Sequence, residues 1–339
     1  LITVDGLRSD YGSFDGSKSL TPLMEESVQF LSVLAPHPDA LPAHSSIMSG
    51  LQPLEHGAIW EGDRLKNTIE TLPRVMKREG FATAAFVSSE DLSVDRGLSL
   101  GFYAYDDSLG WFLPGFGNLL VSKIPIWPRG STVRSMTETK ERFREWHSEW
   151  NDGSFLAWIH IGEEPLSSEG RDGYDRWLER LSGEILDIQR SILDKGSWDN
   201  TMFIVAGTHG FMLETKEGFS GSQGLYDDVV HVPFLIRYPK GEYGGRVITD
   251  QTRSFDLYAT VLTRLELRAI TENKSTPLVD YLDGSLKGSL WCPLIGRGKS
   301  REISLLGLRH SDFKYVVDLK TREEEPSVLH WKKLWSCDP

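Results

Sequence analysis

The sequence is poor in cysteine. Only Cys292 and Cys337 occur among its 339 residues, and neither belongs to a Cys-x-x-Cys pair. This scarcity excludes a scaffold built on several disulfides and a zinc centre made of thiolates. Two alternatives stay open for the pair: one disulfide between Cys292 and Cys337, or two unpaired thiols.

Long apolar runs and an excess of positive charge are also missing. No run of 18 apolar residues occurs, so none of these residues is predicted to span a membrane. The net charge of −12 argues against a sequence-independent nucleic-acid binder, which needs a basic face. Hydrophobic residues make up 39% and charged residues 25%. This composition predicts an ordinary folded protein with one large α/β domain or two smaller ones.

The opening residues Leu1, Ile2, Thr3 and Val4 have the pattern of a buried strand. Proteins rarely begin inside a core strand. We therefore expect further residues upstream, and a signal peptide or a membrane anchor is among the alternatives for them.

Short apolar runs alternate with helical patterns along most of the chain, which predicts a mostly parallel sheet with helices on both faces. The expected strands cover residues 1–4, 82–87, 155–161, 202–206 and 234–237. The expected helices begin near residue 21, run from 71 to 80, and cover 132–150, 174–195 and 255–265. Residues 303–308 and 313–319 predict a hairpin. We thus expect an α/β domain over residues 1–300 and a small antiparallel extension over 301–339.

Polar residues follow three of the expected strands. Asp5, His160 and the pair Thr208-His209 each come at the end of an apolar run. Because the ends of parallel strands meet at one edge of a sheet, we expect these side chains to converge there. The acidic pair Glu163-Glu164 and the acidic run Glu323 to Glu325 are expected to be solvated surface.

Several motifs, in order along the chain, resemble the sulfatase family of the alkaline phosphatase superfamily. They are LITVDGLRSD from residue 1, APHPDALPAHSSIMSG from residue 35, DNTMFIVAGTHG from residue 199 and GLYDDVVHVPFLIRYP from residue 224. The resemblance implies a mostly parallel central sheet flanked by helices. It also implies a divalent cation among carboxylates, and a nucleophile that is a formylglycine in sulfatases or a Ser or Thr in phosphoesterases.

The residues at the matching positions depart from this pattern. Asp5 matches the first metal carboxylate, but Gly6 follows it where many sulfatases have a second Asp. Ala40 stands at the nucleophile position, and a methyl group cannot attack or ligate a metal. Thr208 replaces the Asp of an Asp-His or Asp-Asn pair. Gln223 replaces a His or Lys that would hold the anion.

Other positions of the resemblance survive. His44 occupies the place of a loop His or Arg, His56 lies in a His-Gly turn, and His160 follows its strand; each is either a pocket residue or a structural histidine. Asp39, Ser45 and Ser46 are the alternative nucleophiles close to Ala40. The two serines are expected to face into the following helix, where capping and packing are the usual roles.

These departures predict a sulfatase-like protein that is catalytically inactive and has a structural, binding or assembly role. The alternative is an active metal-dependent hydrolase or transferase of sulfate or phosphate esters with a rearranged site. No cofactor is expected; if one binds, it is a single divalent cation (Ca²⁺, Mg²⁺ or Mn²⁺) at Asp5 and His209.

An inactive family member needs a partner. The segment from Gly110 to Trp127 is rich in aromatic and aliphatic residues, and it predicts either a loop folded over the core or a contact surface for protein partners, including a membrane-associated assembly. No nucleic-acid partner is expected. The resemblance implies an extracytoplasmic location, periplasmic or extracellular, with anchoring through upstream residues as an option.

Overall fold

The structure is a computed structural model that describes residues 1–10, 18–60, 62–109, 133–150, 153–165, 170–216, 219–271, 273–297, 303–311, 313–319 and 332–333. Three sequence predictions lie outside these residues: the contact segment from Gly110 to Trp127, the acidic run Glu323 to Glu325, and the pairing of Cys337. Cys292 is buried.

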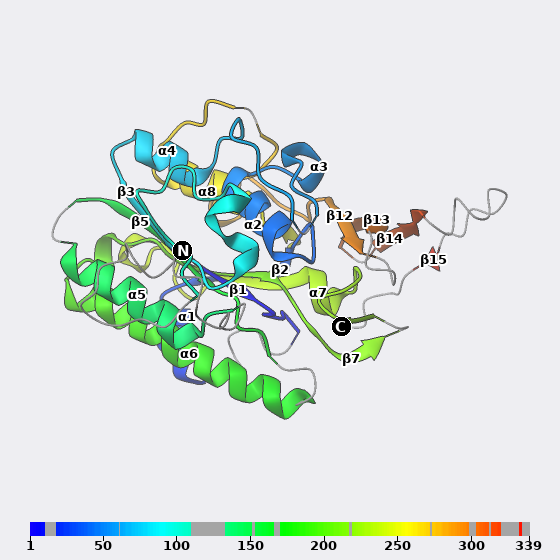
Figure 1. The fold of residues 1–339 in the computed structure, drawn as a ribbon, viewed down its shortest axis with the longest axis horizontal. Coiled ribbons are helices and arrows are strands. Elements are labelled where there is room, and N and C mark those ends of the chain that lie inside the picture. Colours follow the sequence, from blue (N-terminus) through cyan, green and yellow to red (C-terminus); the bar gives the residue numbers. More distant parts are fainter. Residues whose placement is uncertain are drawn as a thin grey trace, which may run out of the picture.

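A central sheet organises the fold (Figure 1). Its strand order is β10-β2-β9-β6-β1-β5-β3-β4, and β11 also pairs with β2. Strand β9 runs antiparallel to β2 and β6, whereas the other pairings in this sheet are parallel. The prediction of a mostly parallel sheet is therefore confirmed. The strands are β1 (Ile2–Asp5), β2 (Val28–Leu34), β3 (Ala82–Phe86), β4 (Ala104–Asp106), β5 (Phe155–Ile161), β6 (Phe203–His209), β9 (His231–Arg237), β10 (Val247–Ile248) and β11 (Thr252–Arg253).

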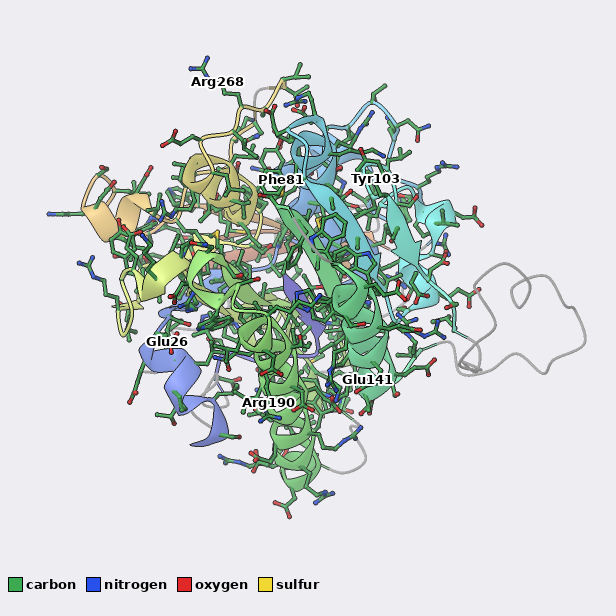
Figure 2. The ribbon with its side chains drawn as sticks, turned by 90° about the vertical axis from the view of Figure 1, so that its left-hand side faces the viewer. Glu26, Phe81, Tyr103, Glu141, Arg190 and Arg268 are labelled. Atoms are coloured by element: carbon green, nitrogen blue, oxygen red, sulfur yellow. The ribbon has the colours of Figure 1, made fainter. Side chains whose placement is uncertain are left out.

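Helices cover both faces of this sheet (Figure 1). One face packs against α2 (Ala40–Ser49), α4 (Leu72–Arg78) and α8 (Asp256–Arg264). The other packs against α1 (Thr21–Glu25), α5 (Met136–Glu149) and α6 (Gly170–Asp194). Figure 2 shows this second layer from the side, with Glu141 on α5 and Arg190 on α6. Among the described helices, none is both long enough and apolar enough to cross a membrane.

Helix α6 illustrates why the sequence forms this layer. Its buried apolar residues recur every three or four positions, which places them on one face of a helix. They are Tyr174, Trp177, Leu178, Leu181, Ile185, Ile188 and Ile192. The shorter elements are α3 (Pro53–His56), α7 (Asp227–Val230), α9 (Asp280–Asp283), β7 (Met212–Lys216), β8 (Phe219–Gly221) and the 3-10 turns Lys18–Leu20, Glu90–Leu92, Val94–Arg96, Trp198–Asn200 and Pro239–Gly241.

A small antiparallel sheet lies at one end of the molecule (Figure 1). It consists of β12 (Cys292–Arg297), β13 (Ile303–His310), β14 (Phe313–Asp318) and β15 (Lys332–Lys333), in that order. The predicted hairpin is β13 and β14. Strand β12 precedes residue 301, so the small sheet draws one strand from the segment assigned to the larger domain. Its inner face packs on Leu34, Leu225 and Val229.

The alternation of side chains along the strands positions the functional residues. Ile2 and Val4 of β1 pack in the core beneath α6, so Thr3 and Asp5 face the opposite side, toward α2. In the same way, Trp158 and Ala206 belong to the core beneath α2. The residues two positions further on, His160 and Thr208, point in that direction too.

A bulge brings two residues of β6 next to Asp5. Val4 pairs with Gly207, but Asp5 pairs with His209, so Thr208 is an extra residue in the register. An extra residue bends the strand and redirects side chains. Consequently both Thr208 and His209 approach the carboxylate of Asp5, and the convergence predicted from the strand ends is observed.

Candidate active site

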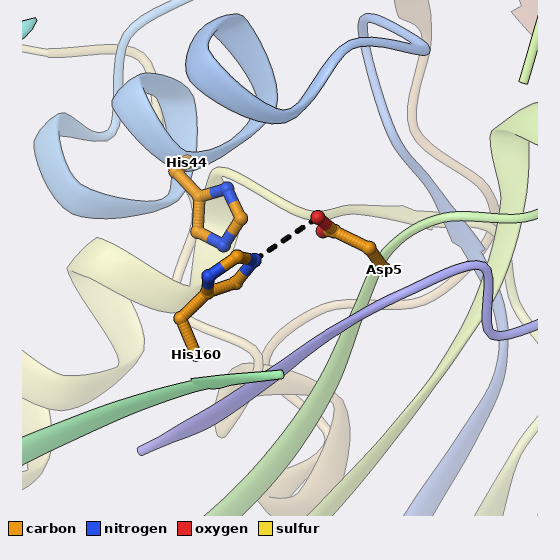
Figure 3. Close-up of side chains that lie close together, drawn as sticks. All are labelled: Asp5, His44 and His160. Atoms are coloured by element: carbon orange, nitrogen blue, oxygen red, sulfur yellow. Dashed lines mark hydrogen bonds and ion pairs between the residues drawn. The ribbon is translucent and has the colours of Figure 1, made fainter. Parts of the chain in front are cut away.

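The carboxylate of Asp5 lies at the centre of the site and is almost fully buried (4% exposed). Its Oδ1 accepts a hydrogen bond from the Thr208 hydroxyl, and its Oδ2 accepts one from Nε2 of His160 at 3.0 Å (Figure 3). Burial alone would raise the pKa of Asp5, but His160 and His209 outweigh it and hold this pKa far below its ordinary value. Asp5 is therefore a carboxylate whose two oxygens are both engaged by protein donors.

The tautomer of His160 follows from its neighbours. The backbone N–H of Ser88 donates to Nδ1 of His160 at 3.3 Å, so Nε2 carries the proton that goes to Asp5. The Ser88 hydroxyl also lies 3.3 Å from Nδ1, and its oxygen accepts the backbone N–H of Gly162 at 2.7 Å. His160 is thus held on both sides and is completely buried.

His44 is also locked in place. Its Nδ1 lies 2.7 Å from the carbonyl oxygen of Ala40, to which only an N–H can donate. Its Nε2 lies 2.9 Å from Oγ1 of Thr3, and that oxygen accepts the indole N–H of Trp158. Burial, with His160 alongside, lowers the pKa of His44 to about 3. His44 is a neutral imidazole that fastens α2 to β1.

His209 lies between two carboxylates. Its Nε2 is 3.6 Å from Oδ1 of Asp5 and 3.5 Å from Oε1 of Glu164, and its Nδ1 lies 3.1 Å from the carbonyl oxygen of Gly210. Burial lowers the pKa of His209, but the two carboxylates outweigh burial and raise this pKa above its ordinary value. In turn, burial raises the pKa of Glu164 to about 6 despite the opposing charge of His209. The two carboxylates therefore favour the protonated, positively charged form of His209.

Ala40 is the first residue of α2 and lines the cleft above this centre. The residue before it, Asp39, does not cap the helix; its carboxylate accepts hydrogen bonds from Arg297 of β12, with Nε at 2.7 Å and a second guanidinium nitrogen at 2.6 Å. The helix start thus presents a methyl group where a nucleophile is expected from the resemblance. Asp39, the neighbouring alternative nucleophile, is engaged with Arg297.

The cleft has a volume of about 1100 Å³. Five candidate residues named from the sequence line it: Asp5, Asp39, Ala40, His209 and Gln223. Glu163 and Glu164 line it as well, so the expectation that this pair is solvated surface is wrong. Their place is explained by the chain path, because they follow β5 directly and so reach the same sheet edge as Asp5. Sequence reasoning also missed the cleft-lining residues Arg134, Arg180 and Arg297.

The remaining predicted residues are structural. His56 is buried, with Nε2 3.0 Å from the Ser46 hydroxyl and Nδ1 accepting the Ala58 N–H. Burial lowers its pKa to about 4. Ser45 and Ser46 are fully buried on α2, as expected for packing residues. Neither serine lies on the cleft wall formed by the described residues.

The backbone conformation at position 6 explains why glycine occurs there. Its φ of +77° is a conformation that L side chains rarely adopt. A Cβ at this position would lie 2.9 Å from Cδ of Pro165, which is closer than real Cβ contacts. A side chain at position 6 would therefore require the Glu164-Pro165 segment to move.

Comparison with known proteins agrees with the fold described above. Residues 129–267 match the family model Sulfatase. The structure is similar to that of a phosphonate monoester hydrolase of Agrobacterium radiobacter, with 17% sequence identity and a TM-score of 0.70. The match covers 94% of this chain and 87% of that chain. The chain has the fold of these hydrolases and sulfatases.

Other solved sulfatase-fold structures are similar. A phosphonate monoester hydrolase from Silicibacter pomeroyi has 16% identity and a TM-score of 0.73, with 94% of this chain and 86% of that chain covered. A 2-O GAG sulfatase has 14% identity and a TM-score of 0.69, with 97% and 86% covered. No curated protein sequence matches the chain.

The sulfatase fold implies a divalent cation, and the donor atoms can be tested for it. Within the described residues, the ligand atoms of Asp5, His44 and His160 lie within 4.8 Å of one another (Figure 3). However, both nitrogens of both histidines are engaged in the contacts given above, and so are both oxygens of Asp5. Hard divalent cations prefer six or more oxygen ligands. This arrangement does not fit such an ion.

Proposed function

We propose that the protein does not hydrolyse sulfate or phosphate esters and instead uses its sulfatase-fold cleft to bind a partner or ligand. One observation supports this proposal most strongly: Ala40 begins α2 and lines the cleft, so the position from which attack is expected carries only a methyl group. Losing a nucleophile removes the covalent route that divides the difficult step into two easier ones.

The neighbouring side chains do not compensate for Ala40. The Asp39 carboxylate is engaged with Arg297, and the hydroxyls of Ser45 and Ser46 are buried inside α2. Gln223 lines the cleft and is neutral, so it adds no charge to hold an anionic ester. A cleft without a nucleophile still offers a concave surface for binding.

Turnover assays test this proposal. The purified protein is incubated with an aryl sulfate, an aryl phosphodiester and an aryl phosphonate monoester, each with Ca²⁺, Mg²⁺ or Mn²⁺ in turn. We expect no turnover above the rate without protein. Turnover that disappears in Asp39→Asn or in His209→Gln would contradict the proposal, because these two residues line the same cleft as Ala40. Turnover that both variants retain is assigned to a contaminating enzyme after repurification removes it.

The second candidate is a metal-dependent hydrolase or transferase with a rearranged site. The closeness of Asp5, His44 and His160 is the observation that favours it. It predicts turnover that requires a divalent cation and is lost in Asp5→Asn.

The proposed partner contact is the segment from Gly110 to Trp127. Its content of aromatic and aliphatic residues supports this role. Removing residues 111–127 is expected to abolish complex formation while the circular dichroism of the protein stays unchanged; normal assembly would contradict the idea. An extracytoplasmic location is likewise proposed from the resemblance, and cell fractionation tests it.

A further inference from the structure

We infer that a metal-free hydrogen-bonded cluster has taken over the place of the cation in this fold, and that the Thr208 hydroxyl is the group that keeps the cation out. The cluster consists of Asp5, Thr208, His160 and Ser88, and is called the Asp5 cluster below. The inference concerns how the site is held together and goes beyond the proposed binding role.

The Asp5 cluster connects four adjacent strands. Asp5 ends β1, Thr208 lies on β6, His160 lies on β5, and Ser88 follows β3; these strands are neighbours in the order β6-β1-β5-β3. Hydrogen bonds run along this edge from Thr208 to Asp5, from His160 to Asp5, and from the Ser88 N–H to His160. A cation held by strand-end carboxylates would tie the same strand ends together. The hydrogen bonds therefore supply the link.

If a cation bound Asp5, Nε2 of His160 would lose its acceptor, whereas the Thr208 hydroxyl would keep only the Val4 carbonyl oxygen, which lies 3.2 Å away. Thr208 and His160 are fully buried, so water does not replace the lost acceptor. Leaving a buried donor unpaired costs about 1–3 kcal/mol per group. A cation would therefore have to compensate for the unpaired His160 N–H and for the lost Thr208–Asp5 hydrogen bond, and the cluster offers it a single carboxylate, Asp5.

The cluster contains one carboxylate among the described residues. Asp5 is the carboxylate inside the cluster, and the next one, Glu164, lies 3.5 Å from Nε2 of His209. A metal centre collects several carboxylates whose mutual repulsion the ion relieves. With Thr208 beside Asp5 there is no second carboxylate at that contact to repel it.

The substitution that tests this is Thr208→Asp. It places a second carboxylate against Oδ1 of Asp5, removes the donor, and leaves His209 next to both. We expect this variant to unfold at a temperature several degrees below the wild type in EDTA and to regain much of the difference when excess Mn²⁺ or Ca²⁺ is added. Thr208→Val is the matched control: it also loses the hydroxyl, so its unfolding temperature falls, but added cations do not restore it.

Measurements on the wild-type protein test the inference even if the Thr208→Asp variant does not fold. The unfolding temperature of the wild type is expected to be the same in EDTA and in excess Mg²⁺, Ca²⁺ or Mn²⁺, and elemental analysis is expected to find no stoichiometric divalent cation. A bound cation, or a lower unfolding temperature in EDTA, would overturn the inference. A folded Thr208→Asp variant that ignores cations would overturn the role given to Thr208.

These outcomes are separate from those of the turnover assays. A bound cation without turnover contradicts the Asp5 cluster as a replacement but leaves the proposed binding role in place. Turnover without a bound cation contradicts the proposed binding role but leaves the Asp5 cluster as a replacement for the cation in place.

Discussion

The Thr208 hydroxyl donates a hydrogen bond to Oδ1 of Asp5 across the pairing of β6 with β1. This contact exists because the bulge in β6 places Thr208 as an extra residue beside the end of β1. It converts a position where the sulfatase resemblance calls for a second carboxylate into a donor for the first one. The replacement of a carboxylate by the Thr208 hydroxyl changes the chemistry of the site as much as Ala40 does.

Asp5→Asn tests the contribution of the buried carboxylate to stability. The amide has one oxygen instead of two charged ones, so it cannot accept from both Thr208 and His160 with charge assistance. Hydrogen bonds to charged groups contribute about 1.5–3 kcal/mol each. We expect the free energy of unfolding to fall by about 3 kcal/mol in urea titrations. The control is Asp199→Asn, whose side chain is 82% exposed and which should change stability by less than about 0.5 kcal/mol. Equal effects of both variants would contradict the prediction.

Stability is expected to fall as the pH drops below about 6.5. Burial lowers the pKa of His37 and His44 to about 3 and that of His56 to about 4, from an ordinary value of 6.5. Their contribution is therefore complete above pH 6.5 and is lost as the pH falls, because the unfolded chain takes up protons that the folded chain refuses. Each histidine adds up to about 1.4 kcal/mol per pH unit.

Asp5 and His209 are among the other groups that contribute to this pH profile. The depressed pKa of Asp5 acts in the same direction, but only below the ordinary pKa of 3.8. His209 has a raised pKa, so it contributes stability at low pH that is lost as the pH rises through its folded pKa. Urea unfolding at several pH values between 7 and 4.5 measures the slope. His56→Gln should reduce the slope by about 1.4 kcal/mol per pH unit; an unchanged slope would show that His56 is not the source.

Gly6→Ala separates backbone strain from steric contact. Both Gly6 and Gly284 have positive φ (+77° and +84°), but an added Cβ meets Pro165 at position 6 and nothing within 4 Å at position 284. The shared backbone cost is about 1–2 kcal/mol. We expect Gly284→Ala to lose about that amount and Gly6→Ala to lose more, as measured by thermal unfolding. If the two variants lose the same amount, the Glu164-Pro165 segment yields easily and a residue such as Asp is tolerated at position 6.

Arg297→Gln tests the link between the small sheet and the start of α2. Arg297 and Asp39 are 17% and 18% exposed, and two guanidinium nitrogens lie within 2.7 Å of one carboxylate oxygen. A charge-assisted pair in this partly enclosed setting should contribute about 1–2 kcal/mol. Arg190→Gln is the control, because that pair with Asp187 is exposed and should contribute less than about 1 kcal/mol. Equal losses in urea titrations would show that the link is no stronger than a surface ion pair.

Much of the fold could be predicted from local pattern. The apolar runs at residues 155–161 and 82–87 and the helical repeat of α6 need no distant information, because period-two and period-3.6 patterns identify a strand and a helix by themselves. Strand β12 was missed because Pro293 and Gly296 interrupt its pattern. The antiparallel direction of β9 was also not visible, since an apolar run has no direction.

Some features of the candidate site could likewise be predicted from the sequence, and others could not. Ala40 and Thr208 are visible in the sequence, because the atom a side chain lacks does not depend on the fold. What Asp5 binds, which tautomer His160 adopts and why position 6 must be glycine depend on strand pairing, on the bulge in β6 and on Pro165, more than 150 residues away. The sequence alone thus determined which reactive groups are missing. Only the tertiary structure decided that hydrogen bonds occupy the vacated contacts, because distances between remote residues arise from packing and not from their order in the chain.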